Sequence, residues 1–435
     1  MRMGHIRRTI SNHVLSLYDD YPRQFWVLMG AAFIDMVGNS LLLTFFALFL
    51  TDKFDISMAR AGVVFAIFAA TSFVGSTLGG ALVDSIGRKP VVLFGLVASA
   101  LGNLAVVLAD SFTLVCAFAA ILGIADSIAT PAWQSMKADI LPPEKRSEGF
   151  GLSRVLFNLA LVVGPALGGL LAGVSFVLVF AVDAVASVIT AILLFIFIPE
   201  TKPDRPKDTA MQQKPDSLLR TFRGYGQVLG DRTFFVFVLI STAVSLVYFQ
   251  MNTTLSVYLR DERGIALEQF GLLISLNAVL IVALQLSVTR KIRRRGLPSM
   301  LVLAVGTLCY ALGFSMFGYT HTYALFALAM VVITAGEILS VPVGQAIAAR
   351  LAPDHMRGRY LAVYSLNLMI ASGLGPWLAG QVINTLGFEW VWYIAGFIGV
   401  GAALAYFAMH LMVDVPETAP RPVERAPERV AETGR

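Results

Sequence analysis

The chain has 435 residues, of which 57% are hydrophobic and only 14% are charged, and its formal net charge is +5. Soluble domains carry about a quarter charged residues, so this composition leaves too few charges to cover the surface of a soluble protein. It therefore excludes an ordinary soluble fold and indicates an integral membrane protein, with a mean hydropathy of +0.74.

Residues 1–24 are polar and basic and lack the apolar segment and cleavage site of a signal peptide. We expect them to form a cytoplasmic tail. Six apolar runs long enough to cross a bilayer follow in residues 25–198: 25–50, 60–83, 90–109, 112–138, 149–173 and 176–198. The first run contains Asp35, with Asn39 one helical turn later on the same face.

The loop between the second and third runs reads GGALVDSIGRKPVVL. In it, Gly80 would permit close helix approach, and Gly87 would allow the left-handed turn that ends a helix. Asp84 would accept hydrogen bonds from the N-terminal end of a neighbouring helix. A hairpin held by positive charge alone explains the two basic residues but not the acid with both glycines.

This loop resembles the signature loop of the major facilitator superfamily. It matches at Gly80, Leu82, Asp84, Gly87, Arg88 and Lys89 and has Ser85 where the family has a basic residue. The resemblance implies two pseudo-symmetric bundles of six helices in an all-α membrane fold. It also implies that the loop is a gate, in which Asp84 contacts the eleventh span.

The fourth run contains Asp126, close to the middle of the bilayer at 1.5 Å per residue. The fifth run contains Gly164, Pro165, Gly168 and Gly169, which resemble a motif found mainly in antiporters of the superfamily, although Ala160 replaces an earlier glycine. Small residues that let helices pack are the alternative explanation. We expect Asp183, in the sixth run, to be a hydrated residue near the outer surface.

Residues 199–232 are the long polar stretch within the chain, and we interpret them as a cytoplasmic linker with an amphipathic interfacial helix. Six further runs fall in residues 233–412: 233–259, 266–288, 299–318, 323–349, 359–385 and 390–412. Residues 413–435, rich in Pro, Glu and Arg, are predicted to be a disordered cytoplasmic tail.

The two sets of spans are repeats. Five residues of the fourth span and the loop after it recur in the tenth span and its loop, each pair 211 positions apart; the pairs include Asp126 with Glu337 and Gln134 with Gln345. Such repeats normally face each other across a site near the middle of the membrane. We therefore expect Asp126 and Glu337 to lie at the same depth in opposite halves.

Glu337 stands in VVITAGEILSVPVGQAI with no basic residue within a helical turn. A charge at the bilayer centre costs about 3 to more than 10 kcal/mol, so such acids are functional by default. The segment is similar to the tenth span of multidrug:proton antiporters, which implies a protonatable glutamate in the cavity. A neutral acid that is hydrogen-bonded within a bundle is the alternative for Asp35, Asp126 and Glu337.

A set of amide and aromatic residues near mid-span is predicted to line the cavity with these acids, although for any single one packing is favoured over ligand contact: Asn39, Trp133, Gln134, Tyr248, Phe249, Gln250, Gln345 and Asn367. Cavities that bind amphipathic ligands are mostly apolar with a few convergent polar groups. The family often has an arginine four residues before Gly123, where this chain has Ala119.

The basic residues predict the orientation. With the N-terminus in the cytoplasm, 29 of the 33 lysines and arginines fall in cytoplasmic segments and four in outer loops. Both termini are then cytoplasmic in a multi-pass protein of the inner or plasma membrane.

No nucleotide-binding loop and no catalytic cluster is legible, so we expect neither an enzyme nor a primary pump. The sequence favours a monomeric, proton-coupled exporter of amphipathic or cationic small molecules, with no cofactor, metal or nucleic acid. The alternatives are a carrier for a small polar metabolite, such as a sugar or amino acid, and a non-transporting receptor or scaffold.

Overall fold

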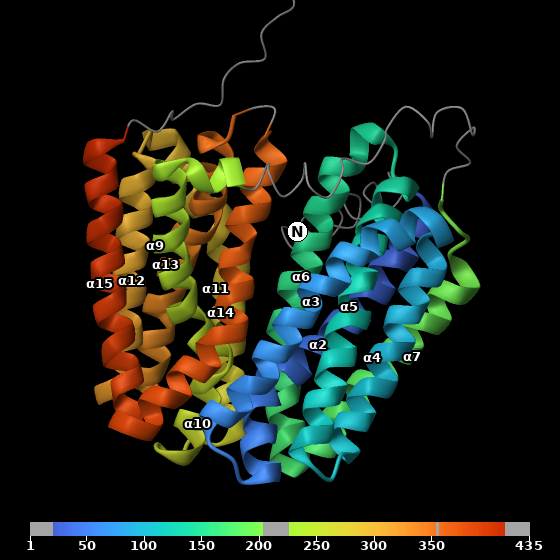
Figure 1. Cartoon of the computed structure of the whole chain (residues 1–435), viewed down its shortest axis with the longest axis horizontal. Coiled ribbons are helices and arrows are strands. Elements are labelled where there is room, and N and C mark those ends of the chain that lie inside the picture. Colours follow the sequence, from blue (N-terminus) through green and yellow to red (C-terminus); the bar gives the residue numbers. More distant parts are fainter. Residues whose placement is uncertain (1–20, 203–225, 354–355, 414–435) are drawn as a thin grey trace, which may run out of the picture.

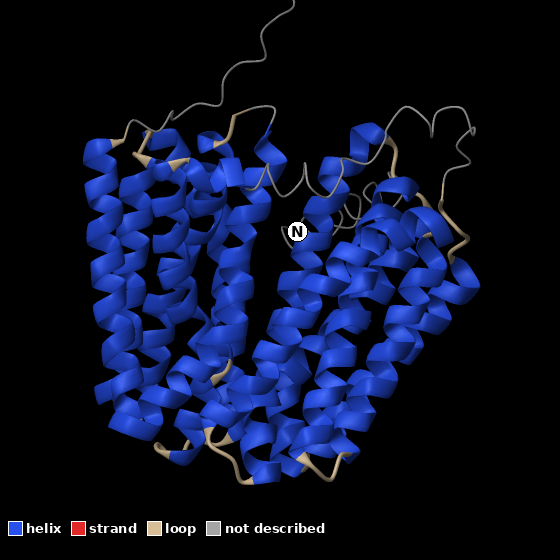
Figure 2. Cartoon of the chain, in the orientation of Figure 1, coloured by secondary structure: helices blue, strands red, loops and turns tan. Residues whose placement is uncertain are grey.

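The computed structural model describes residues 21–202, 226–353 and 356–413. The described residues are almost entirely helical and contain no strand (Figure 2). Twelve helices are long and apolar enough to cross a membrane, which confirms the predicted all-α membrane fold. Most of the predicted interfacial helix and nearly all of both tails lie outside the described residues.

The helices form two bundles that correspond to the two halves of the sequence (Figure 1). The first bundle contains α2 (Arg23–Phe54), α3 (Met58–Ile86), α4 (Arg88–Leu108), α5 (Phe112–Ile140), α6 (Arg146–Val174) and α7 (Phe176–Phe197). The second contains α9 (Arg232–Phe249), α10 (Thr254–Asp261), α11 (Leu267–Arg295), α12 (Ser299–Tyr319), α13 (Tyr323–Leu351), α14 (Arg357–Leu386) and α15 (Phe388–Met412).

The seventh predicted span is not one straight helix. A short 3₁₀ segment, Gln250–Asn252, separates α9 from α10. The Gln250 side chain bonds on both sides of this break: its amide donates to the Leu246 carbonyl at 2.9 Å and its oxygen accepts from the Thr254 hydroxyl at 2.6 Å. At the break in the helix, the Gln250 side chain thus supplies hydrogen-bond partners for a backbone carbonyl and for a hydroxyl group.

Side-chain caps and glycines set several helix ends. Ser57, Ser111 and Ser175 accept a backbone N–H at the starts of α3, α5 and α7, as N-cap serines do. Gly87 ends α3 with φ +114° and ψ 171°. That conformation is open essentially to glycine alone, but it is extended and differs from the left-handed turn predicted there.

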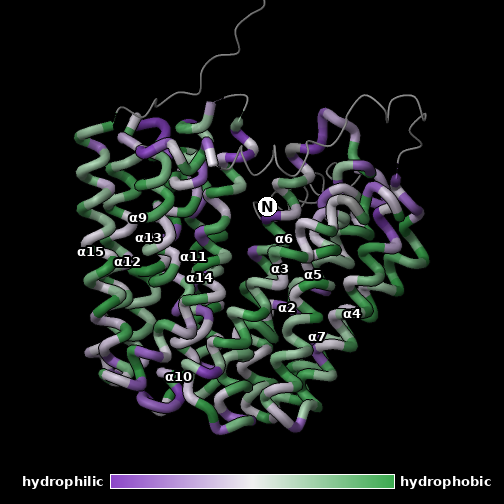
Figure 3. Tube along the Cα trace, viewed as in Figure 1, coloured by the Kyte–Doolittle hydropathy of each residue, from purple (hydrophilic) through white to green (hydrophobic). Residues whose placement is uncertain are grey.

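Large apolar side chains are exposed on both bundles, and the hydropathy colouring in Figure 3 shows hydrophobic residues along most of the length of the helices. Phe397 is 82% exposed and Leu411 is 70% exposed. A soluble protein rarely exposes so much apolar surface to water. This surface is suited to contact with lipid. The helices therefore present many large apolar side chains to the membrane and bury others, such as Trp392 and Phe45, between them.

The two bundles pack together at the end of the molecule that carries α10 (Figure 1). Here α3 meets α14, where Gly62 lies against Trp377 and Gly380 against Ala59, and α10 approaches α2, where Arg260 pairs with Asp52 at 2.9 Å. At the opposite end of α3, the Asp84 side chain is 78% exposed. The bundles are thus closed at the α10 end in this conformation.

Candidate functional site

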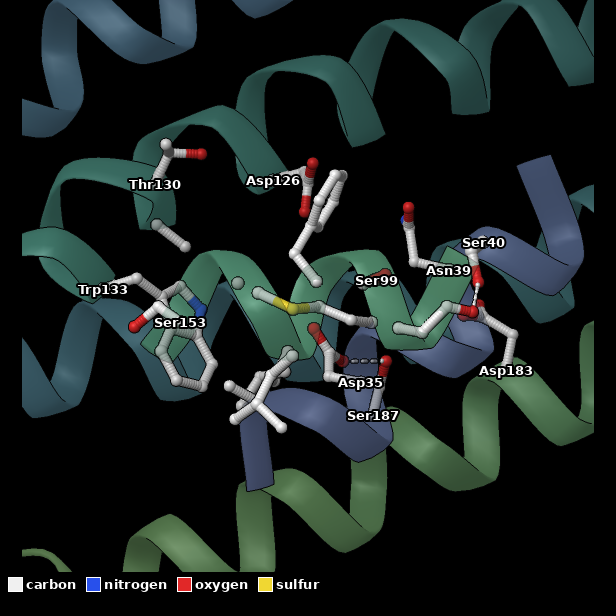
Figure 4. Close-up of a pocket in the computed structure, with 18 of the residues that line it drawn as sticks. Asp35, Asn39, Ser40, Ser99, Asp126, Thr130, Trp133, Ser153, Asp183 and Ser187 are labelled. Atoms are coloured by element: carbon white, nitrogen blue, oxygen red, sulfur yellow. Dashed lines mark hydrogen bonds between the residues drawn. The ribbon is translucent and has the colours of Figure 1, made fainter. Parts of the chain in front are cut away.

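A cavity of about 440 Å³ lies within the first bundle, lined by residues of α2, α4, α5, α6 and α7. Three carboxylic acids line it: Asp35 from α2, Asp126 from α5 and Asp183 from α7. Figure 4 shows them on different walls of the same space. Carboxylates that share one cavity repel one another when they are ionised.

Two of the three acids are held by hydrogen bonds. The Ser187 hydroxyl donates to Asp35 at 2.9 Å, the bond drawn in Figure 4. The Asn103 amide donates to Asp183 at 2.7 Å. These bonds fix the orientation of both carboxyls and link α2 and α4 to α7.

Asp183 differs from its predicted role. It is 2% exposed and lines the cavity, whereas the sequence suggested a hydrated residue near the outer surface. Gly38 explains the difference, because the absence of a side chain there lets α7 approach α2 until Asp183 lies against the Gly38 backbone. The position of Asp183 along its helix did not reveal that this residue lines the cavity.

Asp126 is exposed to the cavity, and no hydrogen bond or ion pair holds its carboxyl among the residues that the structure describes. It begins a line of side chains along one face of α5, all of which line the cavity: Asp126, Thr130, Trp133, Gln134 and Lys137. Their spacing of three to four residues places them above one another on one helix face. Asn39 of α2, another residue that the sequence predicted for the cavity, also lines it.

Glu337 has different surroundings. It lies in α13 of the second bundle, where the Tyr248 hydroxyl donates to one carboxyl oxygen and the Asn277 amide to the other, both at 3.0 Å. Asn277 also bonds Thr334 at 3.0 Å. Glu337 does not line the acid-bearing cavity of the first bundle, so the two acids of the repeat do not share one pocket.

The remaining predicted cavity residues of the second bundle are placed in several ways. Tyr248 holds Glu337, and Phe249 adjoins the helix break. Gln250 and Asn367 are buried at 6% and 7% exposure, and Gln345 is exposed. None of these five residues lines the cavity of the first bundle.

The predicted gate loop is organised by its basic residues. Arg88 is buried and donates from Nε to Asp139 of α5 at 3.0 Å, while Asp84 is 3.9 Å from Arg88 and otherwise exposed. The predicted contact of Asp84 with the eleventh span is not among the contacts of the described residues in this conformation. Gly80 has nothing within 4 Å of its Cβ position, and Gly79 makes the close approach to α5 instead.

Glu200 fixes the start of α4 in this loop. Its carboxylate accepts backbone N–H groups of Arg88 at 2.9 Å and Lys89 at 3.1 Å, and also those of Thr201 and Lys202. Partial burial alone would raise the pKa of Glu200, but these backbone hydrogen bonds outweigh it and lower the pKa below its usual value. An anion at a helix N-terminus is also stabilised by the helix dipole.

The small residues of the fifth span lie where helices cross. Gly164 and Gly168 face α2, against Ser40 and Phe45. Gly169 faces the other bundle, against Leu267 of α11, and Pro165 lies against Gly271 of the same helix. The motif therefore forms part of the contact between the two bundles, which supports the packing explanation without deciding the direction of transport.

Several residues of the site were not singled out by the sequence. Asn103, Ser187 and Asn277 each hold an acid, and Lys137 lines the cavity. A polar side chain inside an apolar span was a visible signal for the first three. Their acid partners are 60 to 152 positions away, so only the fold reveals the pairing.

The sequence matches the family model described as Major Facilitator Superfamily over residues 28–366 and 302–433. It is 27% identical over 419 residues to a Na(+), Li(+), K(+)/H(+) antiporter of Planococcus maritimus, covering 91% of this chain and 97% of that protein. It is 25% identical to a class C tetracycline resistance protein of Escherichia coli, covering 84% of this chain and 90% of that protein.

A solved structure of a POT family transporter in complex with a thioalcohol-conjugated peptide superposes with a TM-score of 0.75. The two chains are 15% identical, and the match covers 90% of this chain and 96% of that one. At this identity the similarity shows the fold alone.

Proposed function

This chain belongs to the Major Facilitator Superfamily and is a transporter rather than an enzyme, and we propose that it exports amphipathic or cationic small molecules in exchange for protons. The observation that carries the proposal is the placement of Asp35, Asp126 and Asp183 around one cavity. Carboxylates attract a cationic substrate, and this cavity presents three of them to a ligand.

The rest of the cavity wall fits the apolar part of such a substrate. Met29, Met36, Trp133 and Phe157 lie among the lining residues. Aromatic faces attract organic cations, and the flexible thioether of methionine adapts to ligands of different shape. A carrier for a sugar or amino acid would need more amides and arginines, and the lining residues of this cavity include no arginine.

An inorganic cation is a second candidate, because one relative is named an antiporter of Na(+), Li(+) and K(+). Among the described residues, however, no three Asp, Glu, His or Cys side chains gather closely enough to hold a metal ion. The three carboxyls surround a space of about 440 Å³, which suits a bulky organic cation better than a bare ion.

In this proposal, the Glu337 carboxyl binds and releases the exchanged proton. It is half-buried in the second bundle, where Tyr248 and Asn277 hold its carboxyl. Proton binding neutralises the acid and removes the cost of a charge within the membrane. Protonation and ionisation of Glu337 thus favour different conformations, and Asp126 links the change to substrate binding.

The proposed orientation places both termini in the cytoplasm, which makes the conformation in Figure 1 closed on the outer side. Exposed Glu262, after α10, would then face outward, and exposed Arg294, at the end of α11, would face inward. With Cys116 and Cys309 replaced by alanine, a cysteine at position 262 should react with an impermeant thiol reagent in intact cells. A cysteine at position 294 should not, and the reverse pattern would invert the topology.

Transport in proteoliposomes tests the function. An imposed proton gradient should drive accumulation of tetraphenylphosphonium against its own gradient, and an inward substrate gradient should move protons outward. Asp35→Asn, Asp126→Asn and the empty vesicle are the controls. Accumulation that follows membrane potential alone and ignores the proton gradient would contradict antiport.

A further inference from the structure

One cation lines the cavity of acids. Lys137 lies in the last turn of α5 and is 7% exposed, yet it shares the cavity with Asp35 and Asp126. Lysines near the ends of membrane helices usually extend their ammonium groups to water. The burial of Lys137 shows that this side chain instead turns inward.

The surroundings of Lys137 stabilise its charge only in part. Its ammonium lies 5.5 Å from the centre of the Phe150 ring, a cation–π arrangement, and the C-terminal end of α5 adds a favourable partial charge. Among the described residues no carboxylate is within ion-pair distance of Lys137, and Asp139, two positions further along the chain, pairs with Arg88 at 3.0 Å. Lys137 therefore lines the cavity without an ion-pair partner among the described residues.

Lys137 and Asp126 form the two ends of one polar stripe. They are eleven residues apart on α5, which places them on the same helix face about 16 Å apart along the axis. Trp133 lies between them, and all three line the cavity. The cavity thus presents a negative end, an aromatic middle and a positive end along one wall.

We propose that Lys137 binds the acidic group of substrates that carry both charges, so that the cavity selects zwitterionic amphipathic molecules over simple cations. This inference rests on the proposed export function and names its substrate class. The amine of the substrate lies by Asp126, its ring system by Trp133, and its carboxylate by Lys137. The carboxylate of the substrate acts as a counter-ion for the Lys137 ammonium.

A matched pair of dyes tests this assignment. Rhodamine B carries a free carboxylate, and its ethyl ester has the same ring system and positive charge without the acid. Binding of both dyes is measured by fluorescence anisotropy with purified wild-type protein, Lys137→Met and Lys137→Arg. Removing a charge-assisted hydrogen bond should weaken rhodamine B binding to Lys137→Met about tenfold or more.

The ester serves as the control for folding. It should bind Lys137→Met within about twofold of wild type, or more tightly, and Lys137→Arg should retain rhodamine B binding because it keeps the charge. Equal losses for both dyes, or no loss for either, would overturn the role of Lys137. If Lys137→Met does not fold, Lys137→Gln is measured in the same way and judged by the same outcomes.

The two proposals fail differently. If wild-type protein exchanges the ester for protons but Lys137→Met does not discriminate between the dyes, only the role of Lys137 is wrong. If neither dye is exchanged for protons by the wild-type protein, the export function itself fails.

Discussion

Asp126 and Glu337 occupy the same position in the two repeats, 211 residues apart, but the structure gives them different surroundings. Asp126 is exposed on a cavity wall, and Glu337 is half-buried and accepts hydrogen bonds from Tyr248 and Asn277. A repeat therefore preserves the position of an acid without preserving its chemistry. We propose that the first bundle binds the substrate and that Glu337 in the second bundle binds the proton.

The largest effect should come from Glu337→Gln, which keeps the shape of the protonated side chain but cannot ionise. We expect proton-driven accumulation of a lipophilic cation to fall to the level of empty vesicles. The same cation should still bind, because Glu337 lies outside the cavity, and its affinity should fall only as far as the coupling between cation and proton requires. Parallel transport and binding assays on one preparation measure both.

A loss of cation binding in Glu337→Gln as large as the loss of transport would end the division of roles between the bundles. Wild-type accumulation in this variant would make Glu337 structural.

Asp126→Asn should give the next largest effect. This variant should lose cation binding, whereas Glu337→Gln should lose the proton step. Losing one partner of a charge pair in a poorly solvated site costs about 2–5 kcal/mol, so cation affinity should fall at least about thirtyfold. The protein should still fold, because no described residue depends on the Asp126 carboxyl for a hydrogen bond. Isothermal calorimetry with tetraphenylphosphonium measures the change, and an uncharged ligand of the same size is the control; an equal loss for both ligands would show a change of cavity shape instead.

Asn277→Ala tests how the surroundings of Glu337 affect its function. It removes one of the two donors to the carboxyl and the partner of Thr334. Leaving a buried acceptor unsatisfied costs about 1–3 kcal/mol, so the melting temperature should fall and the pH dependence of transport should shift. Ser187→Ala, which removes the donor to Asp35, is the matched change in the first bundle; a shift of the same size there would show that the two bundles share proton binding.

The smallest effect should come from Asp84→Asn. Its side chain is 78% exposed and 3.9 Å from Arg88, so insertion and expression should remain near wild type. Transport should fall several-fold, since the family resemblance implies that Asp84 stabilises the state that is closed on the cytoplasmic side. Thermal stability and transport of the variant, measured together, test this, and full activity would remove the gate from the account.

The sequence predicted the fold well because apolar runs are local signals and the repeat spacing of 211 residues can be read directly from the chain. It also identified Asp35, Asp126 and Asn39 as residues of one cavity. It failed for Asp183, which Gly38 allows to approach α2, and for Lys137, whose direction depends on packing against Phe150. The direction of a side chain around its helix is set by neighbours that are distant in the sequence. The sequence alone does not reveal which residues these neighbours are.

Proton release on substrate binding tests the central claim most directly. Tetraphenylphosphonium is added to purified protein in weakly buffered detergent with a pH indicator, for wild type, Asp126→Asn and Glu337→Gln. We expect proton release from wild type, none from Glu337→Gln although the cation still binds, and little from Asp126→Asn because the cation no longer binds. Undiminished release from Glu337→Gln would contradict the claim that the acid of the second bundle carries the proton.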